Sequence, residues 1–441
     1  MTTVRVSSGD GLYGLPVHPE TPEYQDLTAI VTGANGLTGG SMVKLLSSLP
    51  TRWKHVYCLS RRPPSEQVLR TLGPDAVSRI TTITCDFLAD PESLARTLSQ
   101  AIPKVDYTFY FTYMQPQSDK AGLQGQWSNA EALTEANSKL LSNFLDALSL
   151  SNLIPKRFLL QTGAKHYGFH YGPATNPSFE SDPRVTLESN FYYPQEDLLF
   201  EFCQKHSISW NVVRPSFIIG TATDSALNHL VGLSVYAAVQ AHLGQPLEFP
   251  GDYATWDREH CQSTAMLNAR MEEWAVLSPN TANEAFNMQD GNPYTWGRLW
   301  PYLASWYGAE WNPPTSGESR YKAIQGTYEV PPRGYGHRGT SRYSFTFYEW
   351  SQKSEVEKAW KELAKIHKIQ FDPFHRRDIT FGHADAAVLG GWPLSLSMRK
   401  ARRLGWFGFA DSYHSVFTNI WNMANLGLLV PPAQTEWEET E

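Results

Sequence analysis

The chain has 441 residues, of which 41% are hydrophobic and 18% charged, so we expect one large α/β domain with an attached lobe, or two domains. The net charge of −7 argues against nucleic-acid binding through a basic surface. No apolar run approaches the roughly 20 residues of a membrane helix, and no signal peptide is visible, so no membrane span is expected. Four cysteines without metal-binding spacing are expected to be reduced and mostly buried, which is typical of a cytoplasmic protein: Cys58, Cys85, Cys203 and Cys261.

Alternating apolar and amphipathic stretches predict a parallel, doubly wound sheet over residues 27–220. Residues 1–26 precede it and lack periodicity, so they are expected to form an extended N-terminal extension. The expected strands are 28–31, 54–59, 80–85, 105–111, 157–162 and 209–213. The helices expected between them include one directly after the first strand, 129–149 and 194–206.

After residue 220 the alternation stops, and 221–441 are expected to form a smaller, mostly helical substrate-binding lobe. Some C-terminal segments are expected to return to the first domain. Helices are predicted over 226–243, 263–277 and 353–367. The segment 315–346 is rich in Gly, Arg and Tyr without helical periodicity, which predicts a long loop or lid.

A glycine motif, Thr32-Gly33-Ala34-Asn35-Gly36-Leu37-Thr38-Gly39, follows the first strand and opens a helix. Gly33 would permit the tight turn, Gly36 would let the backbone approach a pyrophosphate, and Gly39 would let helix and strand pack closely. The helix N-terminus would face the phosphates. The alternative, an ordinary glycine-rich turn, is disfavoured by this strand–helix context. The residues expected to contact a dinucleotide here are Thr32, Gly33, Asn35, Gly36, Leu37 and Gly39.

The second strand ends at Ser60-Arg61-Arg62, where an acidic residue would select NAD. Arginines instead suit a 2′-phosphate, so the pattern favours NADPH/NADP, although both side chains could simply be solvent-exposed. Asp86, after the third strand, is expected either to hold the adenine amino group or to cap a helix. Thr112 and Tyr113 follow the fourth strand, at the edge of the sheet where ligands bind.

A tyrosine and a lysine are the candidate catalytic pair, although none of the 21 tyrosines has a lysine four residues later. Tyr192 opens a predicted helix in which Glu196 and Asp197 suit the helix dipole, and Lys165 follows the fifth strand. A nearby lysine and the helix N-terminus would favour the anionic form of the phenol, and its hydroxyl could donate to an oxygen that gains negative charge during hydride transfer. Singly, each could be structural, but their joint position at the sheet edge favours catalysis.

His166 and His170 lie four residues apart, but Gly168 between them argues against a helix. No third ligand is evident, so we expect structural or pocket-lining histidines and no metal.

These motifs resemble the progesterone 5β-reductase/iridoid synthase-like family of short-chain dehydrogenases. The resemblance rests on the glycine motif, Ser60-Arg61-Arg62, Gln161-Thr162-Gly163-x-Lys165-His166-Tyr167, Asn190-Phe191-Tyr192-Tyr193-x-x-Glu196-Asp197 and Arg214-Pro215-x-x-Ile218-x-Gly220. It is patchier afterwards, in 230–238 and 283–287. It implies an extended short-chain dehydrogenase fold, NADPH, and reduction of activated C=C bonds, with Lys165 and Tyr192 as the catalytic residues. We expect further cofactor contacts from Arg214, Pro215, Ser216 and Ile218, and a substrate pocket formed by Tyr113, Tyr171, Tyr192 and Phe381.

Two segments depart from the family pattern and are expected to touch the pocket: 315–346, which is longer, and 168–171, which differs in sequence. The resulting hypothesis is an NADPH-dependent 1,4-reductase of a small apolar enone or enal, in specialised metabolism. Carbonyl reduction, cofactor-assisted cyclisation or isomerisation, and a non-catalytic NADP-binding regulator are the alternatives. A homodimer is possible.

Overall fold

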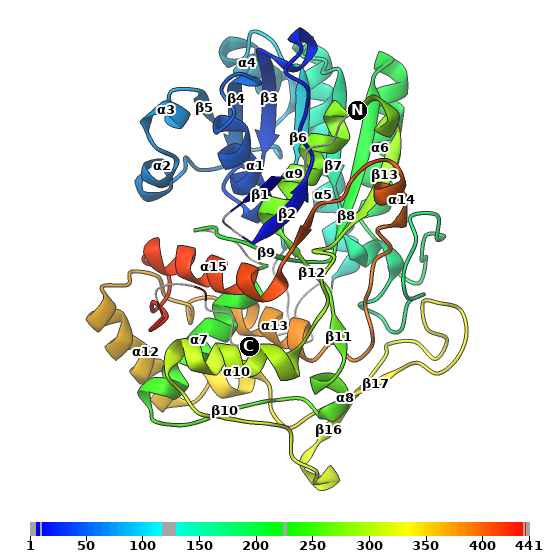
Figure 1. The fold of residues 1–441 in the computed structure, drawn as a ribbon. Helices are drawn as coiled ribbons and strands as arrows, with labels where there is room; N and C mark the ends of the chain where they lie inside the picture. Colours follow the sequence, from blue (N-terminus) through cyan, green and yellow to red (C-terminus); the bar gives the residue numbers. More distant parts are fainter. Residues whose placement is uncertain (1–5, 9–10, 117–128, 224–226, 435–436, 438–441) are drawn as a thin grey trace.

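The computed structural model describes residues 6–8, 11–116, 129–223, 227–434 and 437. Its upper half in Figure 1 is a sheet with helices on both faces, and its lower half is a mostly helical lobe. This arrangement confirms the predicted extended Rossmann architecture with a helical C-terminal part.

The sheet has seven parallel strands in the order β13-β8-β7-β6-β3-β4-β5. The chain winds outward in both directions from β3 and β6, which creates the switch point where such sheets bind ligands. Six of the strands confirm the prediction, whereas β13 is a short strand that periodicity did not reveal. The strands are β3 (Leu27–Thr32), β4 (Trp53–Ser60), β5 (Ile80–Thr84), β6 (Tyr107–Tyr110), β7 (Arg157–Gln161), β8 (Ser209–Pro215) and β13 (Glu284–Met288).

Helices bury both faces of this sheet because successive strand residues point to opposite sides. Ile30 contributes to the core beneath α4 (Pro91–Ala101), α5 (Ala130–Leu150) and α6 (Tyr192–His206). Ala29 and Val31 contribute to the core beneath α1 and α9, which are Leu37–Ser47 and Ala265–Leu277. Two short helices, α2 (Glu66–Leu72) and α3 (Pro74–Val77), follow β4.

The sheet half and the lobe are therefore not separated by a single boundary at residue 220. The predicted helix 263–277 exists as α9, but α9 and β13 belong to the sheet half. Tertiary pairing decides this placement, because β13 pairs with β8 in register Phe286–Val213.

The lobe has its own core, rich in tryptophan, that includes Trp296, Trp300 and Trp306. The predicted helices 226–243 and 353–367 are confirmed as α7 and α12, although residue 226 lies outside the described residues. The lobe's helices are α7 (His229–His242), α8 (Tyr253–Trp256), α10 (Trp296–Tyr307), α11 (Phe347–Ser351), α12 (Ser354–His367), α13 (Arg377–Val388) and α15 (Ser412–Asn425). Short paired strands link its loops: β9 (Phe217–Ile219) with β12 (Gln262–Thr264), β10 (Leu247–Glu248) with β15 (Trp311–Asn312), and β11 (Glu259–His260) with β14 (Tyr294–Thr295).

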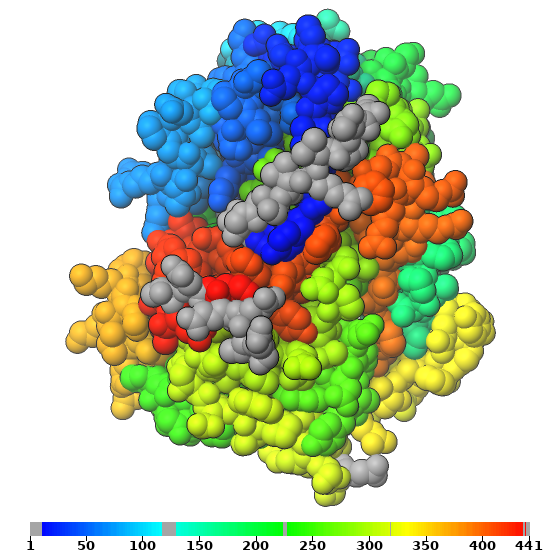
Figure 2. Space-filling view, in the orientation of Figure 1, coloured from blue at the N-terminus to red at the C-terminus, as the bar shows by residue number. Residues whose placement is uncertain are grey.

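The N-terminal segment is not merely an extended lead-in. β1 (Val6–Ser8) and β2 (Leu12–Leu15) form a small antiparallel sheet with β18 (Phe409–Ala410), which follows α14 (Arg399–Arg403). Figure 2 shows this dark-blue segment lying against the orange part of the chain near residue 400. The pairing partner is about 400 residues away, so no local pattern could indicate it.

The segment 315–346 contains a hairpin rather than a structureless loop. Its strands β16 (Lys322–Gln325) and β17 (Thr340–Tyr343) pair antiparallel and project at the lower right of Figure 1. The tip returns to the sheet half, where the Thr327 N–H donates to the Tyr171 carbonyl at 2.7 Å.

In the described part of the chain, no helix is long and apolar enough to cross a membrane. The four cysteines are free thiols, and three of them are buried.

Candidate active site

A cavity of about 520 Å³ opens at the carboxyl ends of the strands, between the sheet and the lobe. Its walls come from the β3–α1 turn, from the segments that follow β4 to β8, and from α13 of the lobe. The residues needed for nucleotide binding and those of the candidate catalytic pair thus share one cavity.

The glycine turn has the geometry that a pyrophosphate requires. Gly33 has φ +61°, which favours glycine. A Cβ on Gly39 would lie 2.2 Å from the Gly33 carbonyl oxygen, so only glycine lets helix and turn approach this closely. Gly36 caps α1 without a side-chain hydrogen bond, which leaves the first N–H groups of the helix for a ligand.

Asn35 connects this turn to the end of β4. Its Nδ2 donates to the Arg62 carbonyl at 2.7 Å and to Ser60 Oγ at 3.3 Å. Ser60, Arg61 and Arg62 line the cavity, and both arginine side chains are exposed. Two guanidinium groups at this position fit the 2′-phosphate of NADP(H).

Asp86 also lines the cavity, and its Oδ1 accepts from the Leu88 N–H at 3.0 Å. It is not a helix cap, because α4 begins with Asp90 as its N-cap. Thr112 and Tyr113 lie on the wall beyond β6, as predicted.

Tyr192 and Lys165 reach the same cavity from different elements. Tyr192 is the first residue of α6, and its Oη lies 2.8 Å from the position that a Cβ on Gly163 would occupy. Lys165 lies in a short 3₁₀ helix after β7, and its Nζ is 5.5 Å from the centre of the Phe191 ring.

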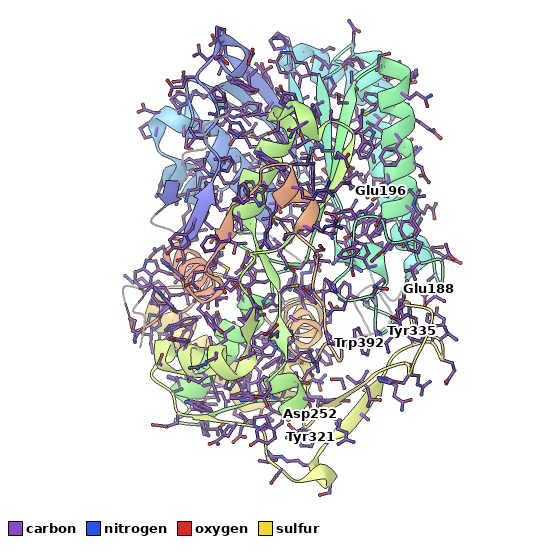
Figure 3. All side chains as sticks on the ribbon, turned by 45° about the vertical axis from the view of Figure 1, so that its right-hand side comes forward. Glu188, Glu196, Asp252, Tyr321, Tyr335 and Trp392 are labelled. Carbon is purple, nitrogen blue, oxygen red and sulfur yellow. The ribbon has the colours of Figure 1, made fainter. Side chains whose placement is uncertain are left out.

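Burial acts on both groups of the pair. It raises the pKa of the Tyr192 phenol well above its usual value, so the hydroxyl stays protonated and the expected preference for the anion is wrong. Burial lowers the pKa of Lys165 to about 7, and the negative charge of Glu188 acts in the opposite direction. Figure 3 places Glu188 close to the hairpin that carries Tyr335, and Tyr328 of that hairpin donates to the Glu188 carboxylate.

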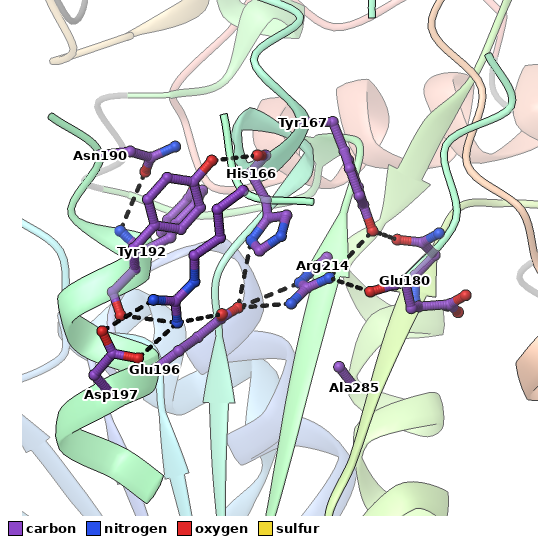
Figure 4. A network of polar contacts seen from close by, with 12 residues as sticks. His166, Tyr167, Glu180, Asn190, Tyr192, Glu196, Asp197, Arg214 and Ala285 are labelled. Atoms are coloured by element: carbon purple, nitrogen blue, oxygen red, sulfur yellow. Dashed lines mark hydrogen bonds and ion pairs between the residues drawn. The ribbon is translucent and has the colours of Figure 1, made fainter. Parts of the chain in front are cut away.

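Position 196, where a Tyr-x-x-x-Lys motif would place its lysine, holds a buried glutamate (Figure 4). Glu196 Oε1 accepts from Arg214 Nη2 at 2.9 Å, and His166 Nδ1 lies 3.5 Å from the same oxygen. Burial alone would raise the pKa of Glu196, but the His166 ring and the Arg214 charge outweigh it and lower that pKa to about 2. Neither partner lines the cavity.

Four predicted site residues do not line the cavity: Thr32, Arg214, Tyr171 and Phe381. Thr32 is buried, and its Oγ1 accepts from the Phe111 N–H at 3.1 Å. Tyr171 packs on Tyr328, and Phe381 belongs to the lobe core. The other predicted cofactor-binding and pocket residues do line the cavity.

Phe169 and His383 line the cavity in place of the predicted Tyr171 and Phe381. Each lies two residues from the position that was predicted. The hairpin lies outside it, since none of its described residues reaches the wall. Further wall residues that the sequence did not indicate are Phe191, Gln195, Phe217, Leu227 and Arg376. No local pattern distinguishes them from core residues.

The seven-stranded parallel sheet, the glycine turn and the cavity define a Rossmann fold of the extended short-chain dehydrogenase class, and the relatives reported below mark it as an oxidoreductase. Within that class, the chain belongs to the PRISE-like Rossmann-fold family, whose model matches residues 29–328. NADPH/NADP is the cofactor that this fold and the arginine-bearing turn accommodate.

Curated relatives agree with this assignment. The short chain dehydrogenase gsfE of Penicillium aethiopicum is 30% identical over 91% of this chain and 99% of its own length. The 3-oxo-Delta(4,5)-steroid 5-beta-reductase of Arabidopsis thaliana is 30% identical, covering 88% and 89% of the two chains. The (S)-8-oxocitronellyl enol synthase of Nepeta racemosa is 34% identical, covering 66% and 72%.

Among solved structures, the terminal R domain of the myxalamid biosynthetic pathway has the same fold. It superposes with a TM-score of 0.57 over 92% of this chain and 93% of its own, at 15% identity.

Proposed function

We propose that the protein catalyses the NADPH-dependent 1,4-reduction of the C=C bond of a small enone or enal. The observation that carries this proposal is the meeting of Tyr192 and Lys165 in one cavity from separate elements. Glu196 occupies the position of the lysine in a Tyr-x-x-x-Lys motif, and it forms an ion pair with Arg214. A site built in this way supplies a hydrogen-bond donor and a positive charge without the usual Tyr-x-x-x-Lys proton relay.

Conjugate reduction needs stabilisation of an enolate oxygen rather than immediate proton delivery to it. When bound in the cavity, NADPH would supply a hydride for the β-carbon. The protonated phenol of Tyr192 donates to the substrate oxygen as negative charge develops there, and the ammonium of Lys165 favours that charge. A proton from solvent water then adds to the α-carbon, so the C=C bond becomes a single bond and the carbonyl is regenerated.

The chemistry of the wall supports a largely carbon-rich substrate next to this pair. Phe169, Phe191, Phe217, Leu227 and Met114 line the cavity. The names of two relatives also support the proposal, since one is a steroid 5-beta-reductase and another an enol synthase.

The test is NADPH consumption with a panel of cyclic enones and linear enals, followed by mass spectrometry of the products. We expect products that gain two hydrogens and keep the carbonyl. Tyr192→Phe should lower kcat by about 10²–10³-fold, as loss of an oxyanion donor does. Tyr193→Phe is the matched control, because the Tyr193 hydroxyl donates to the His166 carbonyl and lies outside the cavity.

Equal turnover by wild type and Tyr192→Phe would remove Tyr192 from the mechanism. An alcohol product would favour carbonyl reduction, and a released enol or ring-closed product would favour the cyclase alternative. Tight NADPH binding without turnover of any enone would favour the regulator alternative.

A further inference from the structure

The lobe wall of the cavity carries two polar side chains among its apolar neighbours, and both come from the α13 segment. Arg376 immediately precedes α13, and His383 lies two turns further along it. His383 is 4% exposed, and its ring centre lies 6.2 Å from that of Phe217 and 6.1 Å from that of His229. Arg376 is exposed, so the wall carries one polar group open to solvent and one that is buried.

Arg376 differs from the arginine beside it. Arg377 Nη2 pairs with Glu357 Oε2 at 2.7 Å and lies over the Phe374 ring. Arg376 forms no ion pair with any carboxylate in the described part of the chain, although it lines the cavity. A guanidinium without a protein carboxylate at a ligand cavity is suited to bind one from the ligand, because its planar fork matches carboxylate geometry.

The charges around the cavity favour an anion at this wall. Among the described residues that line the cavity, Asp86 is the only acid, and it lies after β5 at the nucleotide end. Lys165 adds a second cation near the reacting end of the substrate. His383 adds no charge at neutral pH, since burial lowers the pKa of its ring to about 4, but a neutral imidazole can still donate one hydrogen bond.

We propose that the substrate carries a carboxylate remote from its enone, and that Arg376 binds it with His383 completing the polar part of the lobe wall. This inference rests on the proposed reductase function and specifies its substrate class as an enone acid rather than a wholly apolar enone. Phe169 and Phe217 would then contact the carbon chain between the two polar ends.

The 2′-phosphate of the cofactor does not need Arg376, because Arg61 and Arg62, after β4, are already in place to bind it. The Michaelis constant for NADPH therefore serves as an internal check. It should not change when Arg376 is replaced.

The experiment compares ω-carboxy enones of several chain lengths with their methyl esters, using kcat/KM as the measure. Wild type should prefer at least one acid over its ester by about tenfold or more. Arg376→Gln should bring that ratio close to one and leave the KM for NADPH unchanged. Arg377→Gln removes the same charge one residue away, outside the cavity, and should keep the preference.

A second measurement separates this inference from the reductase proposal. Saturated ω-keto acids and their methyl esters are titrated calorimetrically into the NADP⁺-loaded protein and its Arg376→Gln variant. Arg376-dependent acid binding without turnover of any enone would overturn the reductase proposal alone. Turnover without acid preference, or a raised KM for NADPH in Arg376→Gln, would overturn this inference alone.

Discussion

Arg214 and Glu196 form a buried ion pair that joins the end of β8 to the second turn of α6, with Nη2 and Oε1 2.9 Å apart. Pro215 and Ser216, which directly follow Arg214, line the cavity, and Tyr192 lies one turn before Glu196. The pair thus fixes the catalytic helix against the strand that forms the cofactor wall, without touching either ligand.

Removing Arg214 should therefore destabilise the protein. Arg214→Gln removes the buried charge partner of the Glu196 carboxylate and leaves it only the half-exposed Arg184, whose Nη2 lies 3.4 Å from Oε2. Loss of a buried partner costs about 3–5 kcal/mol in the free energy of unfolding. Urea unfolding followed by tryptophan fluorescence measures this loss. Arg70→Gln is the control, since Arg70 pairs with Glu66 at the surface and should cost about 0–1 kcal/mol. Equal losses of unfolding free energy in the two variants would contradict the larger stabilisation that we assign to the buried pair.

Lys165 should give the reaction a pH dependence near neutrality. Its folded-state pKa is lowered to about 7, so the ammonium is present below that pH and lost as pH rises through it. We expect kcat/KM to fall above about pH 7. Glu188→Gln removes a charge that raises this pKa, so the fall should move to lower pH.

Glu329→Gln is the matched control for Glu188→Gln, because Glu329 pairs with Arg338 on the exposed hairpin. A profile that shifts equally in both variants would show that the effect is not specific to Glu188.

Gly163 should be required to leave room for the catalytic phenol. Its backbone conformation is extended, so alanine introduces no backbone strain, but the new Cβ would lie 2.8 Å from Tyr192 Oη. We expect Gly163→Ala to lower kcat strongly, by about 10²-fold or more if the donor is lost, with an unchanged melting temperature. Gly317→Ala, where a Cβ meets nothing within 4 Å, should be neutral.

Arg61 and Arg62 should determine the choice of cofactor. The double variant Arg61→Ala/Arg62→Ala should raise the KM for NADPH by about tenfold or more and change that for NADH little. Initial rates measured over a range of NADPH and of NADH concentrations give the two KM values to compare. An equal loss for both nucleotides would place the arginines at a shared part of the cofactor.

Local sequence determined the elements with strong periodicity or defined turn chemistry. The strand–glycine turn–helix at 27–47 and the arginines after β4 could be read directly, because the dinucleotide geometry constrains consecutive residues. Tyr192 at the start of α6 and Lys165 after β7 were predictable because each lies at the end of an element that local periodicity indicates. The sequence alone thus specified the fold class, the cofactor turn and the candidate pair.

Only the tertiary structure decided which side chains face the cavity beyond those motifs. His383 and Phe381 are two residues apart on α13, yet one lines the cavity and the other the lobe core. Pairing of β13 with β8, and of β2 with β18, joins segments whose local patterns carry no sign of each other. The partner of Glu196 likewise comes from another element. A buried charge needs an oppositely charged or hydrogen-bonding group, and the folded chain decides which group reaches it.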